Sequence, residues 1–132
     1  MGTKVLDVAV SDSSHDVRGY AHCSASTISP LVQGVTPKAG QVTLLLLNLN
    51  SGNATIVLPR ALSASSYVEY QLTQGSQGVG GPSVLLNGDL LSYTTMKLPT
   101  LSGKAESAAL QLQLAPQSIG FYVFDASFAA CN

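Results

Sequence analysis

The pattern of apolar and polar positions is most pronounced in Gln41–Asn50, which reads QVTLLLLNLN. In an extended strand Val42, Leu44 and Leu46 point to one side, and Leu45, Leu47 and Leu49 point to the other. A strand that is apolar on both sides lies inside a sandwich or is covered on its second face by a neighbouring domain. The run is too short to span a membrane. We therefore predict that it is the central strand of an all-β domain.

The same period of two predicts strands along the whole chain. Leu110, Leu112 and Leu114 are expected inside in Ser107–Leu114, while Ser118–Ala126 is apolar on both faces. Six further strands are predicted at Thr3–Val10, Val17–Ala25, Asn53–Leu58, Ser65–Thr73, Ser83–Leu86 and Asp89–Tyr93. Without an amphipathic helix pattern, residues 1–132 are predicted to form a single antiparallel β-sandwich of eight or nine strands.

Turn residues and alternation predict how several of these strands pair and face. Asn87-Gly88 is the strongest hairpin signal, and the short link between Gln41–Asn50 and Asn53–Leu58 predicts a second hairpin. Alternation in Ser65–Thr73 places Val68, Tyr70 and Leu72 on the core side and Tyr67, Glu69 and Gln71 outward. Alternation in Val17–Ala25 separates Val17, Gly19, Ala21 and Cys23 from Arg18, Tyr20 and His22.

Composition limits the classes of partner. The chain is 45 % hydrophobic and 10 % charged, with a net charge of −1, so a folded domain is expected and disorder is not. Its six basic residues are scattered, which argues against nucleic acid and against an anionic membrane surface. So little charge indicates that part of the surface is covered by another body. The start shows no signal-peptide pattern, and Met1 is compatible with an internal methionine of a longer protein.

The two cysteines, Cys23 and Cys131, form neither a CxxC motif nor a zinc site. Their spacing leaves two interpretations open, namely separate buried thiols or a disulfide. A disulfide would close a loop of roughly a hundred residues and stabilise the fold by about 4–5 kcal/mol in the chain-entropy model. Asn53-Ala54-Thr55 is an N-glycosylation triplet after a turn. A disulfide and a glycan would both indicate a secretory compartment.

We predict no catalytic residue, metal site or cofactor in this chain. Glycosidic hydrolysis needs two carboxyl groups flanking one bond. The seven carboxylates lie mostly in predicted loops: Asp7, Asp12, Asp16, Glu69, Asp89, Glu106 and Asp125. Asp89 follows the Asn-Gly turn, and Glu69 is expected outward, where it could pair with a lysine. His15 lies in a polar loop. His22 and Cys23 point to opposite faces, so His22 is predicted to bond to the backbone.

Aromatic residues leave a second class of function open. Sugar-binding modules expose aromatic rings that stack on pyranose rings, and this chain has no Trp. Tyr20, Tyr67 and Tyr93 could form such a platform, although packing is the commoner use of tyrosine. A free-standing carbohydrate-binding or adhesion module is therefore the alternative hypothesis.

Short motifs in a fixed order carry a family resemblance. They are Gly2–Leu6, Arg18–Cys23, Leu44–Asn50, Val84–Gly88 and Phe121–Phe124, with Ala129-Ala130-Cys131 at the end. Together they resemble the C-terminal β-domain of heparanase-like proteins, glycoside hydrolase family 79, most closely the plant members. The resemblance implies that Cys23 and Cys131 are joined. It also implies a secreted, vacuolar or lysosomal glycoprotein, which agrees with Asn53.

The resemblance further implies a non-catalytic role for this chain. Enzymes of the family cleave β-glucuronide linkages with retention, using two glutamates on a (β/α)₈ barrel that precedes the β-domain. No residue here matches either glutamate motif, so the barrel is absent from this chain. The implied partners are the barrel of the same parent protein and, at the domain border, an acidic polysaccharide or glycoside substrate. Sandwiches of the family also receive strand material from the N-terminal end of the full chain.

Overall fold

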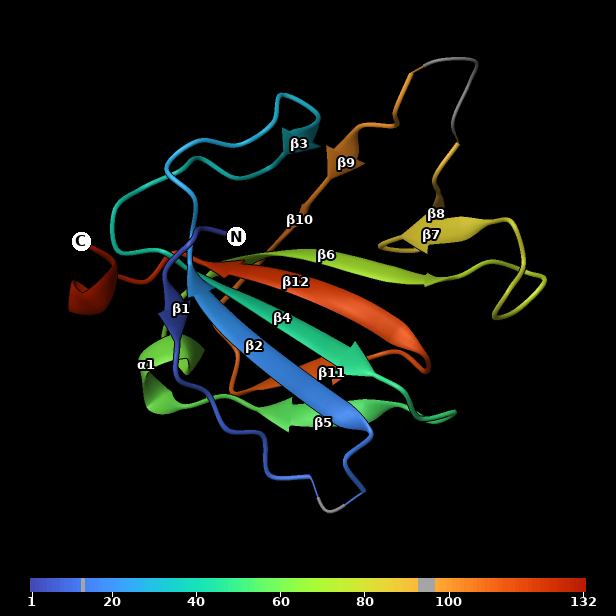
Figure 1. Ribbon diagram of the computed structural model, residues 1–132, viewed down its shortest axis with the longest axis horizontal. Coiled ribbons are helices and arrows are strands. Elements are labelled where there is room, and N and C mark those ends of the chain that lie inside the picture. The colour runs from blue at the N-terminus through green and yellow to red at the C-terminus, as the bar shows by residue number, and fades with distance from the viewer. Residues whose placement is uncertain (13, 93–96) are drawn as a thin grey trace.

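A computed structural model describes residues 1–12, 14–92 and 97–132 (Figure 1). Its main element is an antiparallel sheet of eight strands. They are β1 (Val5–Leu6), β2 (Val17–Cys23), β4 (Val42–Asn48), β6 (Tyr67–Gln74), β7 (Val84–Leu86), β8 (Asp89–Leu90), β10 (Lys104–Glu106) and β12 (Ser118–Phe124). The order is β1-β2-β4-β12-β6-β7-β8, and β10 also pairs with β6.

Smaller elements lie on both sides of this main sheet (Figure 1). On one side β5 (Ala54–Val57) pairs with β11 (Gln111–Leu114), and α1 (Arg60–Ser63) lies beside them. On the other side β3 (Val32–Gln33) pairs in parallel with β9 (Leu101–Ser102). The chain ends in a short 3₁₀ helix, η1 (Ala129–Cys131). The predicted all-β sandwich is confirmed.

The hydrophobic core lies between the main sheet and the layer of β5, β11 and α1. Seven of its residues come from the main sheet and four from the second layer: Ala21, Val42, Leu44, Leu46, Tyr67, Tyr122 and Phe124, with Leu58, Leu62, Leu112 and Leu114. The predicted central strand is confirmed as β4, which lies between β2 and β12. Tyr122 of β12 has no exposed surface, and its ring meets Tyr67 edge-on at 5.9 Å.

The predicted hairpin between the central strand and Asn53–Leu58 is wrong. β4 pairs with β2 and β12, whereas β5 pairs with β11 in the second layer. Buried Asn48 holds the turn that crosses between layers: its Nδ2 donates to Gly52 O at 2.9 Å, and its Oδ1 accepts from Asn50 N at 3.0 Å. A short connection can therefore change layers when a side chain replaces the ladder hydrogen bonds.

The predicted orientation of β6 is also wrong. Phe124 lies opposite Tyr67, and Tyr122 lies opposite Glu69, so Tyr67, Glu69 and Gln71 share the core side with the buried rings of β12. Val68, Tyr70 and Leu72 therefore lie on the other face. Both sets contain apolar residues, so alternation alone could not decide between them. The register between β6 and β12 decides which set faces the core.

Other boundaries differ locally from the predictions. The first strand is only two residues long, because Val10 packs over Gly19 instead of continuing along the sheet edge. Leu110 precedes β11 and is 74 % exposed, although it was predicted inside. The Asn87-Gly88 hairpin is confirmed, with left-handed φ values of 51° and 91°. Tyr93, the predicted end of the next strand, lies outside the described residues.

Helix is a minor component. The sequence patterns did not predict α1, which follows Pro59 and contributes Leu62 to the core. Within residues 1–12, 14–92 and 97–132, neither helical segment has the length and apolar character needed to cross a bilayer.

Candidate functional site

The candidate site is the outer face of the main sheet, meaning the face that points away from β5, β11 and α1. Residues opposite one another on neighbouring strands point to the same face, so the register fixes which side chains lie there. One row across the sheet contains Tyr20, Leu45, Phe121 and Tyr70. The next row contains Arg18, Leu47, Ile119, Leu72 and Leu86. Both rows are predominantly apolar.

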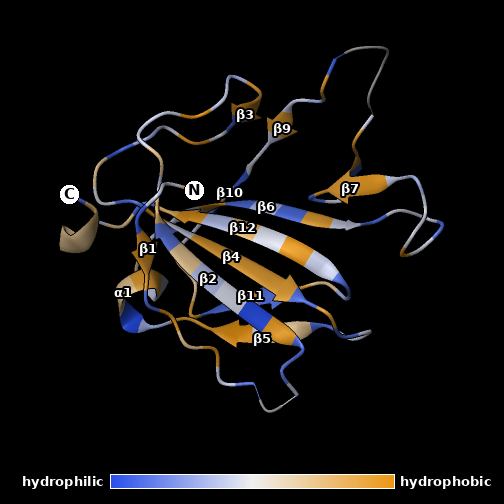
Figure 2. Cartoon of the chain, in the orientation of Figure 1, coloured by the Kyte–Doolittle hydropathy of each residue, from blue (hydrophilic) through white to orange (hydrophobic). Residues whose placement is uncertain are grey.

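Among the described residues, other segments of the chain leave part of the outer face uncovered. We call this part the apolar strip; it consists of Tyr20, Leu45, Leu47, Leu72, Ile119 and Phe121. Tyr20 is 47 % exposed and Ile119 is 39 % exposed, while the other four are half-buried. Figure 2 shows the hydrophobic colour running along β4, which crosses the middle of this face. Contiguous exposed apolar surface of this kind is typical of an interaction site.

A pocket of about 350 Å³ adjoins the apolar strip. Its floor is the outer face, including Thr43, Phe121 and Val123. Its walls are apolar residues of the segment 24–40 and of β9, chiefly Ile28, Val32, Val35 and Leu101. Phe121 and Leu72 belong to both the pocket and the strip. The strip therefore continues into a concavity that opens to solvent.

Specific contacts hold the segment 24–40 over the sheet. The Tyr70 hydroxyl donates to Gln33 O at 2.6 Å, and burial raises the pKa of Tyr70, so this proton stays in place. The hydroxyls of Ser24 and Thr43 are hydrogen-bonded at 2.8 Å. Gly103 crosses directly over Tyr70, where an added Cβ would lie 2.6 Å from the ring, so a larger residue does not fit. The walls of the pocket are therefore fixed by the fold.

A second opening lies on the opposite side of the sheet. A groove of about 750 Å³ is lined by residues 6–11, by the core side of β2 and β4, and by β5 and α1. It reaches the core residues Val42, Leu44 and Leu46. In the described part of the chain, the second layer holds only β5 and β11, so one edge of β5 faces this groove without a neighbouring strand.

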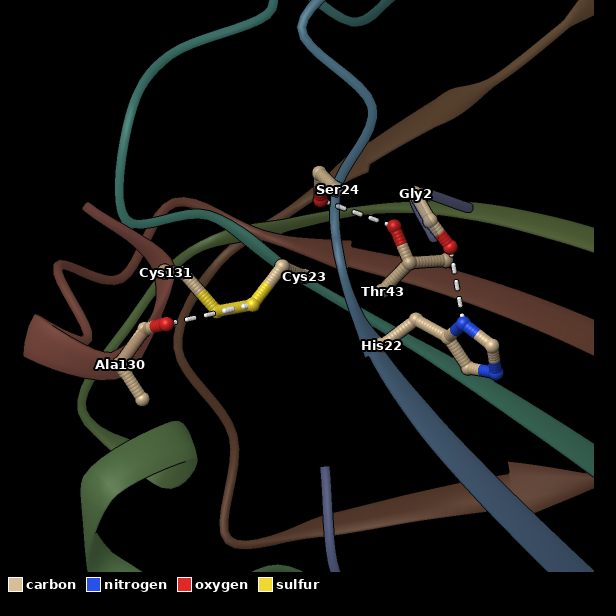
Figure 3. The surroundings of a disulfide bond; sticks show 7 residues. All are labelled: Gly2, His22, Cys23, Ser24, Thr43, Ala130 and Cys131. Carbon is tan, nitrogen blue, oxygen red and sulfur yellow. Dashed lines mark hydrogen bonds between the residues drawn. A yellow bond between two sulfur atoms is a disulfide. The ribbon is translucent and has the colours of Figure 1, made fainter. Parts of the chain in front are cut away.

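The cysteines predicted by the resemblance to be joined form a disulfide (Figure 3). Cys23 at the end of β2 and Cys131 in η1 are 108 residues apart, with a Cα–Cα distance of 5.3 Å. His22 lies beside them, and its Nδ1 is 2.9 Å from Gly2 O (Figure 3). A carbonyl oxygen only accepts, so Nδ1 carries the proton. The predicted backbone contact of His22 is confirmed, and it holds the N-terminal segment on β2.

Glu69 is not outward as predicted but half-buried on the core side of β6. Desolvation raises the pKa of its carboxyl, while the positive charge of Lys104 opposes that shift. Gln71 Nε2 donates to Glu69 Oε1 at 3.0 Å and to the Tyr122 hydroxyl at 3.3 Å. Gln71 Oε1 accepts from Ala115 N at 3.0 Å. These contacts connect the sheet to the end of β11, which is a structural role.

Three of the other carboxylates also have structural partners. Asp12 accepts from Val17 N at 2.8 Å, and this bond to the backbone holds the pKa of Asp12 below its ordinary value. Asp125 pairs with Lys38 at 3.0 Å, and Glu106 pairs with Lys104 at 2.6 Å. Asp89 begins β8 directly after the turn and is exposed. No arrangement among these contacts indicates an acid and a nucleophile facing one bond.

Packing, the commoner use of tyrosine, accounts for Tyr67, one of the three tyrosines considered for a sugar-stacking platform. Tyr67 is buried in the core, where burial raises its pKa, and Tyr93 lies outside the described residues. Tyr20 is exposed and lies opposite Leu45, with Arg18 and His22 on the same face of β2. Asn53 is exposed just before β5, in the second layer of the sandwich. A glycan there would lie away from the outer face.

Sequence reasoning missed the pocket. Residues 26–40, which contain two prolines and two glycines, lie between two predicted strands, and the sequence patterns predicted no packing of this segment on the sheet. The available signal was the set of apolar residues in that loop, Ile28, Val32 and Val35. A solvated loop has no need for such residues, and all three line the pocket.

Comparisons place the chain beside known glycosidases. It is 32 % identical over 133 residues to the hyaluronoglucuronidase of Hirudo nipponia, and 32 % identical over 135 residues to the heparanase of Gallus gallus. The alignments cover 100 % and 99 % of this chain but 26 % and 25 % of those proteins. The chain thus spans about a quarter of the length of the curated relatives it matches. No family model matches the sequence.

A solved structure shares the fold. The GH30 endoxylanase of Clostridium papyrosolvens C71 superposes with a TM-score of 0.51 at 16 % identity, covering 92 % of this chain and 23 % of the xylanase chain. An identity this low supports a common fold only. In sequence the chain is similar to one part of two larger enzymes, and in fold it is similar to one part of a third.

Proposed function

We propose that this chain is the non-catalytic accessory β-sandwich of a heparanase-like β-glucuronidase of glycoside hydrolase family 79. In this role it packs on the catalytic (β/α)₈ barrel of the same parent protein and stabilises it. The observation that carries the proposal is the apolar strip, which the chain's own second layer leaves uncovered. The relatives are about four times as long as this chain, so a parent protein of that length would contain a second domain large enough to cover the strip.

The physical basis is burial of apolar surface. Each Å² removed from water contributes about 25 cal/mol, and interfaces between domains of one chain commonly bury roughly 600–1,500 Å². A strip of six large side chains next to a pocket suits such an interface. The groove beside β5 is the natural place for the strand material that the family resemblance implies, because the free edge of β5 offers main-chain hydrogen bonds.

Catalysis in this proposal belongs to the barrel. The two glutamates of a retaining mechanism lie there, and the sandwich keeps the barrel folded and borders its cleft. An acidic polysaccharide or glycoside is the proposed substrate. The carboxylates of this chain support the proposal, because Asp12, Glu69, Glu106 and Asp125 have structural partners, while Asp89 is an exposed residue directly after a turn. The chain itself is proposed to have no activity.

The proposal includes an oxidising compartment. A disulfide persists in secreted, vacuolar or lysosomal proteins, and the exposed Asn53 triplet would be glycosylated there. The plant-type assignment stays a prediction, since the two curated relatives come from a leech and a bird.

The test is an assay of the full-length parent and of this chain alone on a β-glucuronide substrate. We expect turnover by the parent and none by the isolated chain. In the parent, Leu45→Lys with Ile119→Lys should lower the melting temperature and the yield of active enzyme, because two charges would enter the interface. Turnover by the isolated chain, or a parent without glucuronidase activity, would contradict the proposal.

The exposed ring of Tyr20 supports a second candidate, a free-standing carbohydrate-binding module. A glycan array probed with the isolated chain distinguishes the two functions. Binding that Tyr20→Ala abolishes would favour the module. We expect no binding, because Tyr20 is a single exposed ring that lies opposite Leu45, with no second exposed aromatic ring beside it among the described residues of β2 and β4.

A further inference from the structure

We propose that the pocket beside the apolar strip is a socket for one large apolar side chain of the body that docks on the strip. The occupant is part of the remaining parent chain, so the inference rests on the proposed function and adds where its interface is anchored. Interfaces concentrate binding energy at a few large side chains seated in fully desolvated pockets. The pocket here has the position, size and chemistry for such an anchor.

Position is the first reason. Phe121 and Leu72 are shared by the pocket and the strip, so a body lying on the strip also covers the mouth of the pocket. The pocket is therefore continuous with the proposed interface. A flat strip alone would allow a partner to slide, whereas a socket at its end fixes one position.

Size and chemistry are the second reason. About 350 Å³ of space is enough for one aromatic or long aliphatic side chain and is at the low end for a drug-sized ligand. Floor and walls are predominantly apolar, with Phe121, Val123, Val32 and Leu101 among them. The polar lining residues include Thr27, Ser29 and Gln41, and the Gln41 amide is already bonded to the backbone of its own loop. The hydroxyls of Ser24 and Thr43 are bonded to each other. Few polar groups remain to orient a sugar or an ion, so the matching chemistry is an apolar side chain.

Rigidity is the third reason. The Tyr70–Gln33 hydrogen bond and the close passage of Gly103 over Tyr70 hold the walls in place without an occupant. A preformed socket reduces the ordering cost of association. A collapsed or mobile loop would offer no such advantage.

The first experiment uses this chain alone with small mimics of side chains. Toluene, p-cresol and 3-methylindole are titrated while NMR follows Val32, Leu101 and Val123. We expect saturable shifts at these residues. Ala25→Phe and Val32→Phe place a ring in the pocket from two different walls and should weaken probe binding by at least about tenfold. The matched control Ala64→Phe makes the same change at an exposed position of the second layer and should leave binding unchanged.

The second experiment puts the same variants into the full-length parent. Filling the pocket should leave the melting temperature of the isolated chain unchanged or higher, yet lower that of the parent by about 5 °C, because the anchor is displaced. Ala64→Phe should have little effect in either. This opposite response separates a lost anchor from a misfolded variant.

Each other outcome has a definite meaning. If the pocket variants weaken probe binding but leave the parent's melting temperature unchanged, the occupant is a free apolar molecule and the proposal is wrong. If wild-type chain dimerises in sedimentation and Ala25→Phe prevents this, the occupant is a second copy, which also overturns it. If the parent has glucuronidase activity and both variants leave its melting temperature unchanged, the socket is wrong and the proposed function stands. If the parent lacks that activity and both variants lower its melting temperature, the proposed function is wrong and the socket stands.

Discussion

The two faces of the main sheet have similar apolar content but different cover. On the core side, Val42, Leu44 and Leu46 of β4 lie under β5, β11 and α1 and are almost fully buried. On the outer side, Leu45 and Leu47 of the same strand are only half-buried beside exposed Tyr20 and Ile119. The described part of the chain thus covers the core face fully and the outer face only in part, through the segment 24–40 and β9. In the proposed function the core face serves folding and the outer face serves association.

The sharpest way to test this comparison is a matched pair of phenylalanines on β12. Phe124 has no exposed surface on the core side, whereas Phe121 lies half-buried on the outer side. Phe124→Ala should lower the free energy of unfolding by about 3–5 kcal/mol, because it leaves a cavity in a packed core. Phe121→Ala should cost about 1–2 kcal/mol, in proportion to its smaller burial. Urea unfolding of both variants measures this, and equal losses would contradict the difference between faces.

The disulfide gives the next largest effect. Cys23 lies on the core side of β2, and its bond to Cys131 fastens the C-terminal segment there. Replacing both cysteines by serine should lower the free energy of unfolding by about 2–5 kcal/mol, mainly because the unfolded chain gains freedom. Thermal unfolding with and without dithiothreitol measures it. The reductant should lower the melting temperature of wild type and leave that of the double variant unchanged. If the reductant does not change the melting temperature of wild type, the disulfide does not stabilise the fold.

Glu69 is a half-buried carboxyl on the core side, and it should make stability depend on pH. Its pKa is raised by desolvation, so in the folded state the carboxyl binds a proton more tightly than in the unfolded chain. Folding stability should therefore increase as the pH falls through the folded-state pKa of Glu69 and level off below its ordinary value. Glu69→Gln should remove this increase.

Melting temperatures of wild type and Glu69→Gln between pH 4 and pH 8 test the effect, with exposed Asp89→Asn as the matched control. The difference between wild type and Glu69→Gln should be largest at neutral pH and vanish in acid. At neutral pH Glu69→Gln should be the more stable protein; a wild type that melts higher than Glu69→Gln at neutral pH would show the opposite sign and would mean that the ionised carboxyl is the stabilised form.

The smallest effect on the isolated chain is expected at the strip. Ile119→Thr keeps a β-branched side chain, and the position is 39 % exposed, so the free energy of unfolding should change by at most about 0.5 kcal/mol. Binding of the fluorescent dye ANS should nevertheless decrease, because the variant interrupts the apolar strip. If stability falls as much as in Phe124→Ala, the outer face is part of the folding core and the distinction between faces is wrong.

The sequence predicted the strands better than their partners. Period-two alternation located β2, β4, β11 and β12, because each presents at least one unbroken apolar face. It failed for β6, where Tyr67 and Val68 make both faces apolar, and only pairing with β12 decides the orientation. It also failed for the link from β4 to β5, because a five-residue connection can turn back or change layers.

For the candidate site, the sequence predicted that a surface needs cover but not where its anchor lies. The two-sided leucines of β4 carry the first conclusion directly. The pocket requires residues 28–35 and Leu101 to meet over Phe121, a contact between segments far apart in sequence. Local patterns contain no information on such a contact, whereas the apolar residues in the loop at least indicate that the loop packs on something.

The most direct test of the companion body is a measurement of solvent access to side-chain methyl groups. A soluble nitroxide is added to the isolated chain and to the full-length parent, and relaxation enhancement is compared at Leu45 and Ile119. Leu114 of the core and exposed Leu110, which precedes β11, serve as references. We predict strong enhancement at the strip in the isolated chain and weak enhancement in the parent, with Leu114 low and Leu110 high in both. Equal enhancement at the strip in both proteins would contradict the claim that another body covers this face.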